Sequence, residues 1–188
     1  MPRWEPDSRG RLEEAALALY GERGFENTTV ADIAARAGVT ERTFFRHFAD
    51  KREVLFSGAD ELQALLADAA AGAPPSAPPI DAVAVALEAA GAMFQERRAY
   101  ARQRKAVIAA SAELRERELI KLASLAAVLA HALRARGVAA TTAALAAEAG
   151  IAVFRVAFER WVDEGNQLDL PQLIRASLDE LKVVTAGK

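Results

Sequence analysis

Cysteine is absent from this sequence of 188 residues, and histidine occurs only twice, as His47 and His131. Without cysteine the chain forms no disulfide and offers no thiolate to a metal or a substrate. The two histidines lie far apart in sequence, and neither a glycine-rich phosphate loop nor a GxSxG motif accompanies them. We therefore expect no catalytic activity, no bound metal and no cofactor.

Long apolar runs and alternating patterns are also missing. The N-terminus is charged and no apolar run reaches the roughly 18 residues of a membrane span, so the sequence predicts neither a signal peptide nor a transmembrane helix. No stretch alternates between apolar and polar residues, which leaves β-strands without support. Since 52% of the residues are hydrophobic, the chain can bury a sizeable core. We expect an all-α protein of the cytoplasm, with no membrane partner.

The chain has no large net charge, but basic residues are concentrated in one short segment. The formal net charge is -2, so any site for a polyanion must be confined to a short segment. "GVTERTFFRHFADKREVLF", residues 38–56, contains four phenylalanines and four basic residues. At about 100° per residue, Phe44, Phe45 and Phe48 fall on one side of a helix. The other side then carries Arg42, Thr43, Arg46 and His47.

The first part of the chain has strong helix-capping signals. A helix over about 8–23 ends at Gly24, with Phe25 tucked beneath it. Thr29 and Asp32 have capping-box spacing and begin a short helix, which ends at Gly38. A third helix runs from Thr40 to about residue 48. Asp50 and Glu53, again at capping-box spacing, predict the start of a fourth helix.

A short helix, a glycine turn and a second helix with a basic face form the pattern of a helix-turn-helix that enters the DNA major groove. The alternative from charge alone is a small surface helix with solvated arginines.

"AGAPPSAPP", residues 71–79, predicts an extended linker. We expect a DNA-binding domain over 1–56, a connecting helix to about 71, the linker over 72–79 and a second domain over 80–188. In the second domain the predicted helices cover 80–97, 99–110, 112–136, 141–164 and a segment after Pro171.

The ordered string "TTVADIAARAGVTERTFFRHFADKREVLF" resembles the DNA-binding segment of the TetR family of one-component bacterial regulators. The matching residues are Thr29, Ile33-Ala34, Ala37-Gly38-Val39, Thr43, Phe45, Phe48, Lys51 and Leu55. The resemblance covers roughly residues 8–56. In one departure, the family usually has tyrosine where this chain has Phe45, which has no hydroxyl for a phosphate.

The resemblance implies a role for each matched position. Thr29, Thr43 and Lys51 would meet phosphates, whereas Glu41 and Arg42 would read bases. Arg46 and His47 would serve either purpose, and the alternative for His47 is an exposed histidine without a contact. The complete set of implied DNA contacts is Thr29, Thr40, Glu41, Arg42, Thr43, Phe45, Arg46, His47 and Lys51.

The 141–164 helix has apolar stripes on two opposite sides and therefore needs two covers. The simplest second cover is another subunit, joined by the apolar stripe of the last helix, and the family resemblance also implies a homodimer. The alternative is a central buried helix in a monomer. The predicted interface residues are Leu145, Ala149, Ala152, Val156, Leu173, Ile174, Leu178 and Leu181.

Family members generally hold a small effector among the middle helices. On the 97–110 segment, Arg97 and Arg104 share a side with apolar residues and can meet an acidic or acyl-type ligand, whereas Arg98, Arg102 and Lys105 are expected on a wet face. Solvated cations are the alternative for Arg97 and Arg104, and core packing is the alternative for Met93, Phe94, Phe154 and Phe158. His131 is expected at the surface. The candidate ligand-binding residues are Met93, Phe94, Arg97, Tyr100, Arg104, Ile108, Phe154 and Phe158.

Together these patterns predict a TetR-like regulator. We expect a repressor that binds a palindromic operator in double-stranded DNA as a homodimer and is released by a small-molecule effector. The alternative is a helical ligand-binding or scaffold dimer without sequence-specific DNA binding.

Overall fold

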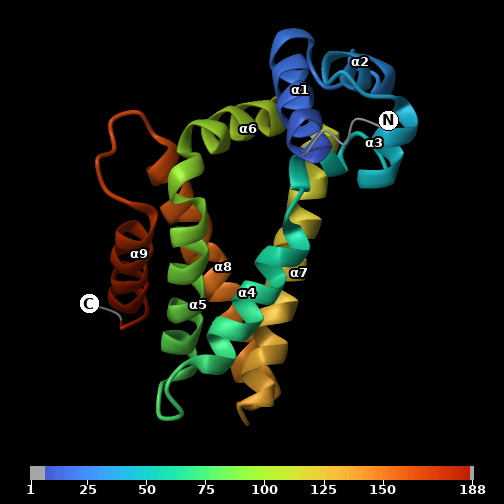
Figure 1. Ribbon diagram of the computed structural model, residues 1–188. Helices are drawn as coiled ribbons and strands as arrows, with labels where there is room; N and C mark the ends of the chain where they lie inside the picture. Colours follow the sequence, from blue (N-terminus) through green and yellow to red (C-terminus); the bar gives the residue numbers. More distant parts are fainter. Residues whose placement is uncertain (1–6, 187–188) are drawn as a thin grey trace. The chain divides into compact units, whose positions relative to one another are not determined.

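The computed structural model describes residues 7–186, and every regular element among them is helical (Figure 1), which confirms the all-α fold class. The elements are α1 (Ser8–Arg23), α2 (Val30–Arg36), α3 (Glu41–His47), η1 (Glu53–Phe56), α4 (Ala59–Gly72), α5 (Pro79–Phe94), η2 (Gln95–Arg97), α6 (Arg98–Ala110), α7 (Ala112–Ala135), α8 (Ala140–Val162) and α9 (Leu170–Thr185).

The chain divides into two compact units. The first contains residues 7–57 and Gln103–Leu119, and the second contains Gly58–Arg102 and residues 120–186. Helices α6 and α7 thus contribute residues to both units. The proline-rich segment lies inside the second unit, where it joins α4 to α5.

The first unit is built on α1, whose inner side is buried at Leu12 and Leu19. The helix ends at Gly24, which adopts a φ of 83° and returns its N–H to the carbonyl of Tyr20. Glycine tolerates such a positive φ without steric cost. Phe25 then packs edge-on against Tyr20, with 5.3 Å between the ring centroids. The predicted helix bounds and the tucked phenylalanine are confirmed.

Helices α2 and α3 form the predicted helix-turn-helix pair. Thr29 and Asp32 make the capping box at the start of α2, and the Thr40 hydroxyl caps α3. Between the two helices, Gly38 has a φ of 68°, which a residue with a Cβ rarely adopts.

The fourth predicted helix is interrupted. Asp50 accepts a hydrogen bond from the Glu53 N–H at 3.2 Å, but the Glu53 carboxylate pairs with Arg117 instead of closing a capping box. The segment forms the short 3-10 helix η1, and Gly58, with a φ of 80°, separates it from α4. The prediction of one continuous helix from Asp50 was wrong, because a residue at positive φ cannot continue an α-helix.

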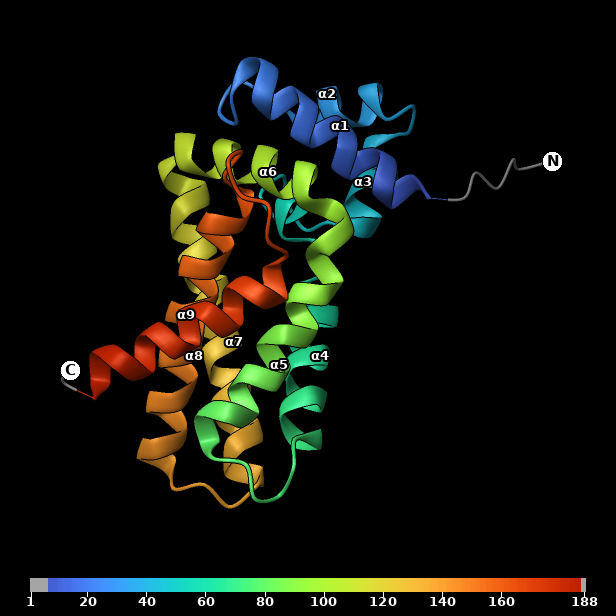
Figure 2. The ribbon, with the colours of Figure 1, turned by 90° about the vertical axis from the view of Figure 1, so that its left-hand side faces the viewer.

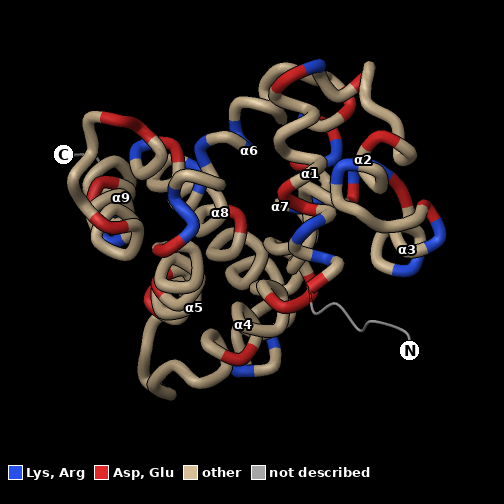
Figure 3. Tube along the Cα trace, turned by 45° about the horizontal axis from the view of Figure 1, so that its top comes forward, with Lys and Arg blue, Asp and Glu red and all other residues tan. Residues whose placement is uncertain are grey.

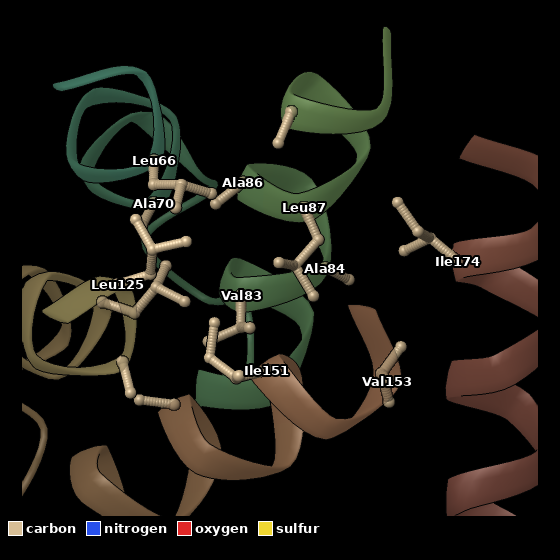
Figure 4. Packing of buried hydrophobic residues seen from close by; sticks show 14 of the residues in the cluster. Leu66, Ala70, Val83, Ala84, Ala86, Leu87, Leu125, Ile151, Val153 and Ile174 are labelled. Atoms are coloured by element: carbon tan, nitrogen blue, oxygen red, sulfur yellow. The ribbon is translucent and has the colours of Figure 1, made fainter. Parts of the chain in front are cut away.

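Helix α5 is central to the second unit, where it packs against α4, α8 and α9 (Figures 1 and 2). Figure 4 shows Val83 of α5 beside Ile151 of α8, with Leu125 of α7 in the same apolar cluster. A Cβ added to Gly150 would lie 2.3 Å from the Val83 Cγ1 atom. The glycine therefore permits the close approach of α5 and α8.

Helix α8 has the two predicted apolar stripes. Ile151 and Trp161 on its inner side are buried, whereas Leu145 and Val156 on its outer side are 67% and 52% exposed. By length and composition α8 could also cross a membrane, but a buried core helix passes the same test. Here the inner stripe belongs to the core of the second unit.

Candidate functional site

Of the three phenylalanines in α3 and at its C-cap, two anchor the helix and the third does not. Phe44 is fully buried and Phe48 is 5% exposed, with 5.5 Å between their ring centroids. Phe45 is 56% exposed, and its ring stands edge-on against Phe44 at 5.4 Å. The prediction that Phe45 shares the anchored side was wrong. It lies about 100° around the helix from Phe44, outside the narrow stripe that a two-turn helix buries.

The exposed side of α3 forms a hollow of about 460 Å³ lined by Arg42, Thr43, Phe45 and Arg46. Both arginines are exposed, as is the neighbouring Glu41. Figure 3 shows these basic positions on α3 beside an acidic one. Guanidinium groups that are exposed in this way can bond phosphate oxygens or the O6 and N7 atoms of guanine.

His47 is half-buried at the end of α3. Its Nε2 atom lies 2.8 Å from the Ser8 hydroxyl and 3.4 Å from the Arg46 guanidinium. Burial lowers the pKa of the His47 imidazole, and the charges of Arg46 and Arg9 lower it further. No local pattern links Ser8, which is 39 residues from His47, or the adjacent Arg9 to α3, so neither could be predicted as its neighbour from the sequence.

Two threonine hydroxyls of the predicted interface, those of Thr29 and Thr40, serve as helix caps. Thr29 donates to Asp32 Oδ2 at 2.6 Å, and this bond is the main reason why the pKa of the Asp32 carboxyl is lowered. The Thr40 and Thr43 hydroxyls lie 3.1 Å apart. Thr29 and Thr40 are exposed and Thr43 is half-buried, so each remains at the surface while it holds the local structure.

Lys51 is turned inward. Its ammonium donates to the carbonyls of Phe25 and Thr28 at 2.9 and 3.0 Å and lies 4.2 Å from the centroid of the Phe25 ring. The Tyr20 hydroxyl donates to the Lys51 carbonyl at 2.6 Å. Burial, with a further contribution from Asp50, raises the pKa of Tyr20, which therefore stays protonated as a donor. Two of the three Lys51 ammonium protons thus stabilise the α1–α2 loop rather than facing DNA.

The predicted ligand-binding residues are divided between the units. Arg104 and Ile108 belong to the first unit. The second unit contains Met93, Phe94, Arg97, Tyr100, Phe154 and Phe158. Rings of Phe94, Phe154 and Phe158 form an aromatic cluster with Trp161, with centroids 5.6 to 6.4 Å apart. The Arg97 guanidinium lies 4.5 Å from the centroid of the Tyr100 ring.

Arg104 lies in the first unit and bonds the protein itself. Its Nε donates to the Leu55 carbonyl at 2.6 Å, and its guanidinium lies 4.9 Å from the centroid of the Phe56 ring. Ile108 is buried in the same unit. The Arg104 side chain therefore stabilises η1, and this position gives no support to a contact with an acidic ligand.

Arg98 and Arg102 were expected on a wet face, and this prediction was wrong. Both are half-buried in the second unit and bond the C-terminal end of α8. Arg98 donates to the Asp163 carbonyl at 2.6 Å, and Arg102 Nε donates to the Val162 carbonyl at 2.7 Å. The last carbonyls of a helix have no partner within it, which explains why two cations gather there.

The predicted dimer residues also fall into two groups. On α8, Leu145, Ala152 and Val156 are exposed and Ala149 is half-buried. On α9, however, Leu173, Ile174 and Leu178 are buried and Leu181 is half-buried in the core of their own unit. The prediction that these α9 residues face a partner was wrong for the three buried ones, which have no surface left to offer.

Comparison with known proteins covers both parts of the chain. A model of bacterial regulatory proteins of the tetR family matches residues 12–57, and a model of the MftR C-terminal domain matches residues 77–186. The HTH-type transcriptional repressor KstR2 of Mycobacterium tuberculosis is 47% identical over 47 residues, and the HTH-type transcriptional regulator TcmR of Streptomyces glaucescens is 51% identical over 47. These alignments span 25% of this chain and 24% and 21% of those two relatives.

Solved structures share the fold over nearly the whole chain. The SmeT–triclosan complex has a TM-score of 0.66 and 23% identity, covering 94% of this chain and 90% of that one. FadR of Bacillus subtilis in complex with stearoyl-CoA has a TM-score of 0.61 and 19% identity, covering 92% and 96%. KstR2, TcmR and FadR are named as regulators of transcription. With its helix-turn-helix and the family matches on both sides of the proline-rich segment, this chain belongs to the TetR family of bacterial transcriptional regulators.

Proposed function

We propose that this regulator is a repressor that binds a palindromic operator as a homodimer and is released by a small-molecule effector. The observation that carries the operator contact is the exposed side of α3. Arg42 stands in its first turn, where it can bond guanine bidentately, and Glu41 beside it can accept from cytosine N4. Arg46 lines the same hollow and would meet a phosphate or a second base.

The homodimer is supported by the outer stripe of α8. Leu145 and Val156 are large apolar side chains that are more than half exposed, and Ala152 lies between them on the same side. Val183 and Val184 on α9 are also exposed, at 52% and 74%. A second copy of this face would bury all of these side chains by two-fold symmetry. Two copies of α3 would then meet two half-sites of a palindrome.

The effector is proposed to be a largely apolar molecule with an acidic or acyl group. The half-buried rings of Phe94, Phe154 and Phe158 offer apolar contact, and Arg97, three residues after Phe94, is a cation that would meet an anionic group. Two structurally similar proteins are solved with triclosan and with stearoyl-CoA, which joins an apolar acyl chain to an anionic group. Binding would favour a state of the dimer that no longer matches the operator, because a ligand shifts an equilibrium by its difference in affinity for the two states.

Operator binding is tested by selecting duplexes from a random pool and measuring affinity by fluorescence anisotropy at two salt concentrations. Arg42→Ala should cost about 1–3 kcal/mol and relax the preference at one base position. Arg36→Ala is the matched control, because Arg36 is an exposed arginine of α2 that pairs with Glu22 at 2.8 Å. An equal loss on every duplex with Arg42→Ala would reduce this residue to a phosphate contact.

The dimer is tested by light scattering on Leu145→Glu. A charge buried between two copies is costly, so this variant should have the mass of a monomer. Leu168→Glu, at an exposed leucine before α9, is the control and should remain dimeric. A monomeric mass for the unmodified protein would refute the proposed assembly.

A further inference from the structure

We propose that Phe45 is a base-reading residue: its ring packs against the 5-methyl group of one thymine in each half-site of the operator. The inference rests on the proposed operator binding by α3 and adds a specific base contact to it. Phe45 is 56% exposed, whereas Phe44 in the same helix and Phe48 at its C-cap are buried. A large aromatic side chain in this position leaves apolar area in water, which a partner surface would cover.

The ring of Phe45 is held in place by its own helix. It stands at 82° to the ring of Phe44, with 5.4 Å between centroids, and Phe44 is fully buried. Edge-to-face pairs of this kind are favourable beyond the area that they bury. The exposed ring therefore rests on a fixed support, and little conformational freedom is lost when it contacts DNA.

The chemistry of the ring determines what it can recognise. Phenylalanine has no hydrogen-bonding group, so it cannot bond a phosphate oxygen or the polar edge of a base. It lines the same hollow as Arg42, three residues earlier on the same side of α3, and Arg46 is beside it. If Arg42 reaches a base edge, the ring enters the major groove with it. The thymine methyl is the apolar group that a base pair presents there.

One other side chain in the hollow carries a methyl group. The Thr43 hydroxyl lies 3.1 Å from that of Thr40, so its oxygen is directed to the helix cap. Thr43 is half-buried, so its methyl group offers less exposed area for contact with a thymine than the Phe45 ring does. A Thr43 variant is therefore the natural control for the contribution of Phe45.

The test replaces each thymine of a selected duplex by deoxyuridine, one position at a time, and measures affinity by fluorescence anisotropy at constant salt. Deoxyuridine lacks only the 5-methyl group. The unmodified protein should lose about fourfold in affinity at one thymine position of each half-site, the value of one buried methyl. Phe45→Ala should bind thymine and deoxyuridine equally at that position, while Thr43→Ser should keep the fourfold difference. Phe45→Leu, which retains an apolar side chain, should keep part of it.

Three outcomes would overturn the proposal. The first is equal affinity for thymine and deoxyuridine at every position of the unmodified protein. The second is a difference that persists in Phe45→Ala. The third is a uniform loss on all duplexes with Phe45→Ala, which would place the ring against the deoxyribose. Each of these leaves operator binding intact, whereas a selection that enriches no sequence would refute the proposed function as well.

Discussion

Replacing Lys51 with methionine separates a structural role from a DNA contact. Methionine keeps the length and apolar character of the side chain and removes the ammonium. That ammonium donates to the Phe25 and Thr28 carbonyls at 2.9 and 3.0 Å and lies 4.2 Å from the centre of the Phe25 ring. We therefore expect Lys51→Met to destabilise the first unit in the absence of DNA.

The size of the effect follows from these contacts. Hydrogen bonds from a charged donor are worth about 1.5–3 kcal/mol each, and a cation above an aromatic ring adds about 0.5–1 kcal/mol. Lys51 is half-buried, so the lower values apply, and the free energy of unfolding should fall by about 3.5 kcal/mol. In a chain of 188 residues this corresponds to a loss of roughly 7–14 °C in Tm.

The assay pairs a thermal or urea unfolding curve with the salt dependence of DNA affinity. A lysine that neutralises a phosphate contributes about -0.9 to the slope of log affinity against log salt concentration. We expect Lys51→Met to lower stability and to leave this slope unchanged for the folded protein. Lys105→Met, which removes the same charge from α6, is the control for loss of charge. Unchanged stability with a slope reduced by about 0.9 would show that Lys51 faces DNA, and the structural argument would fail.

Three further variants test other parts of the structure. The lowered pKa of His47 means that the unfolded chain takes up this proton more readily, so the free energy of unfolding should fall as the pH drops below about 6.5, and urea denaturation of His47→Gln should show a flatter pH dependence there. Gly150→Ala should cost about 1–3 kcal/mol through overlap with Val83, and adding Val83→Ala should restore part of it in the same assay. Arg136→Met should lower Tm, because its guanidinium bonds carbonyls at the C-terminal end of α4, whereas the exposed Arg134→Met should not.

Local chemistry explains why the helix-turn-helix could be predicted almost to the residue. The capping box of Thr29 and Asp32, the Thr40 cap and the glycine turn at Gly38 all act within four residues of the backbone groups that they satisfy. Such signals do not depend on the rest of the fold. The fourth helix failed because Gly58, with a φ of 80°, separates η1 from α4, and its predicted capping box failed because Arg117, 64 residues away, takes the Glu53 carboxylate.

The roles of the cations could not be predicted in this way. The sequence correctly identified a cluster of basic residues, but the carbonyls bonded by Lys51 lie 26 and 23 residues away, and that bonded by Arg104 lies 49 residues away. Arg98 reaches a carbonyl 65 residues along the chain. A helical wheel gives the direction in which a side chain leaves its helix. It does not show which backbone group that side chain will bond. Unpaired carbonyls at loops and helix ends therefore decided the position of each of these three cations.

The same limit explains why α8 and α9 differ as interface helices. A single apolar stripe shows only that one surface covers a helix, and on α9 that surface is the core of its own unit, where Leu173 and Ile174 are buried. Two stripes require two covers, and the core supplies only one to α8. Leu145 and Val156 stay exposed because the core of the second unit covers only the opposite side of α8. The proposed dimer should therefore centre on α8, with α9 contributing through exposed residues such as Val183 and not through its buried leucines.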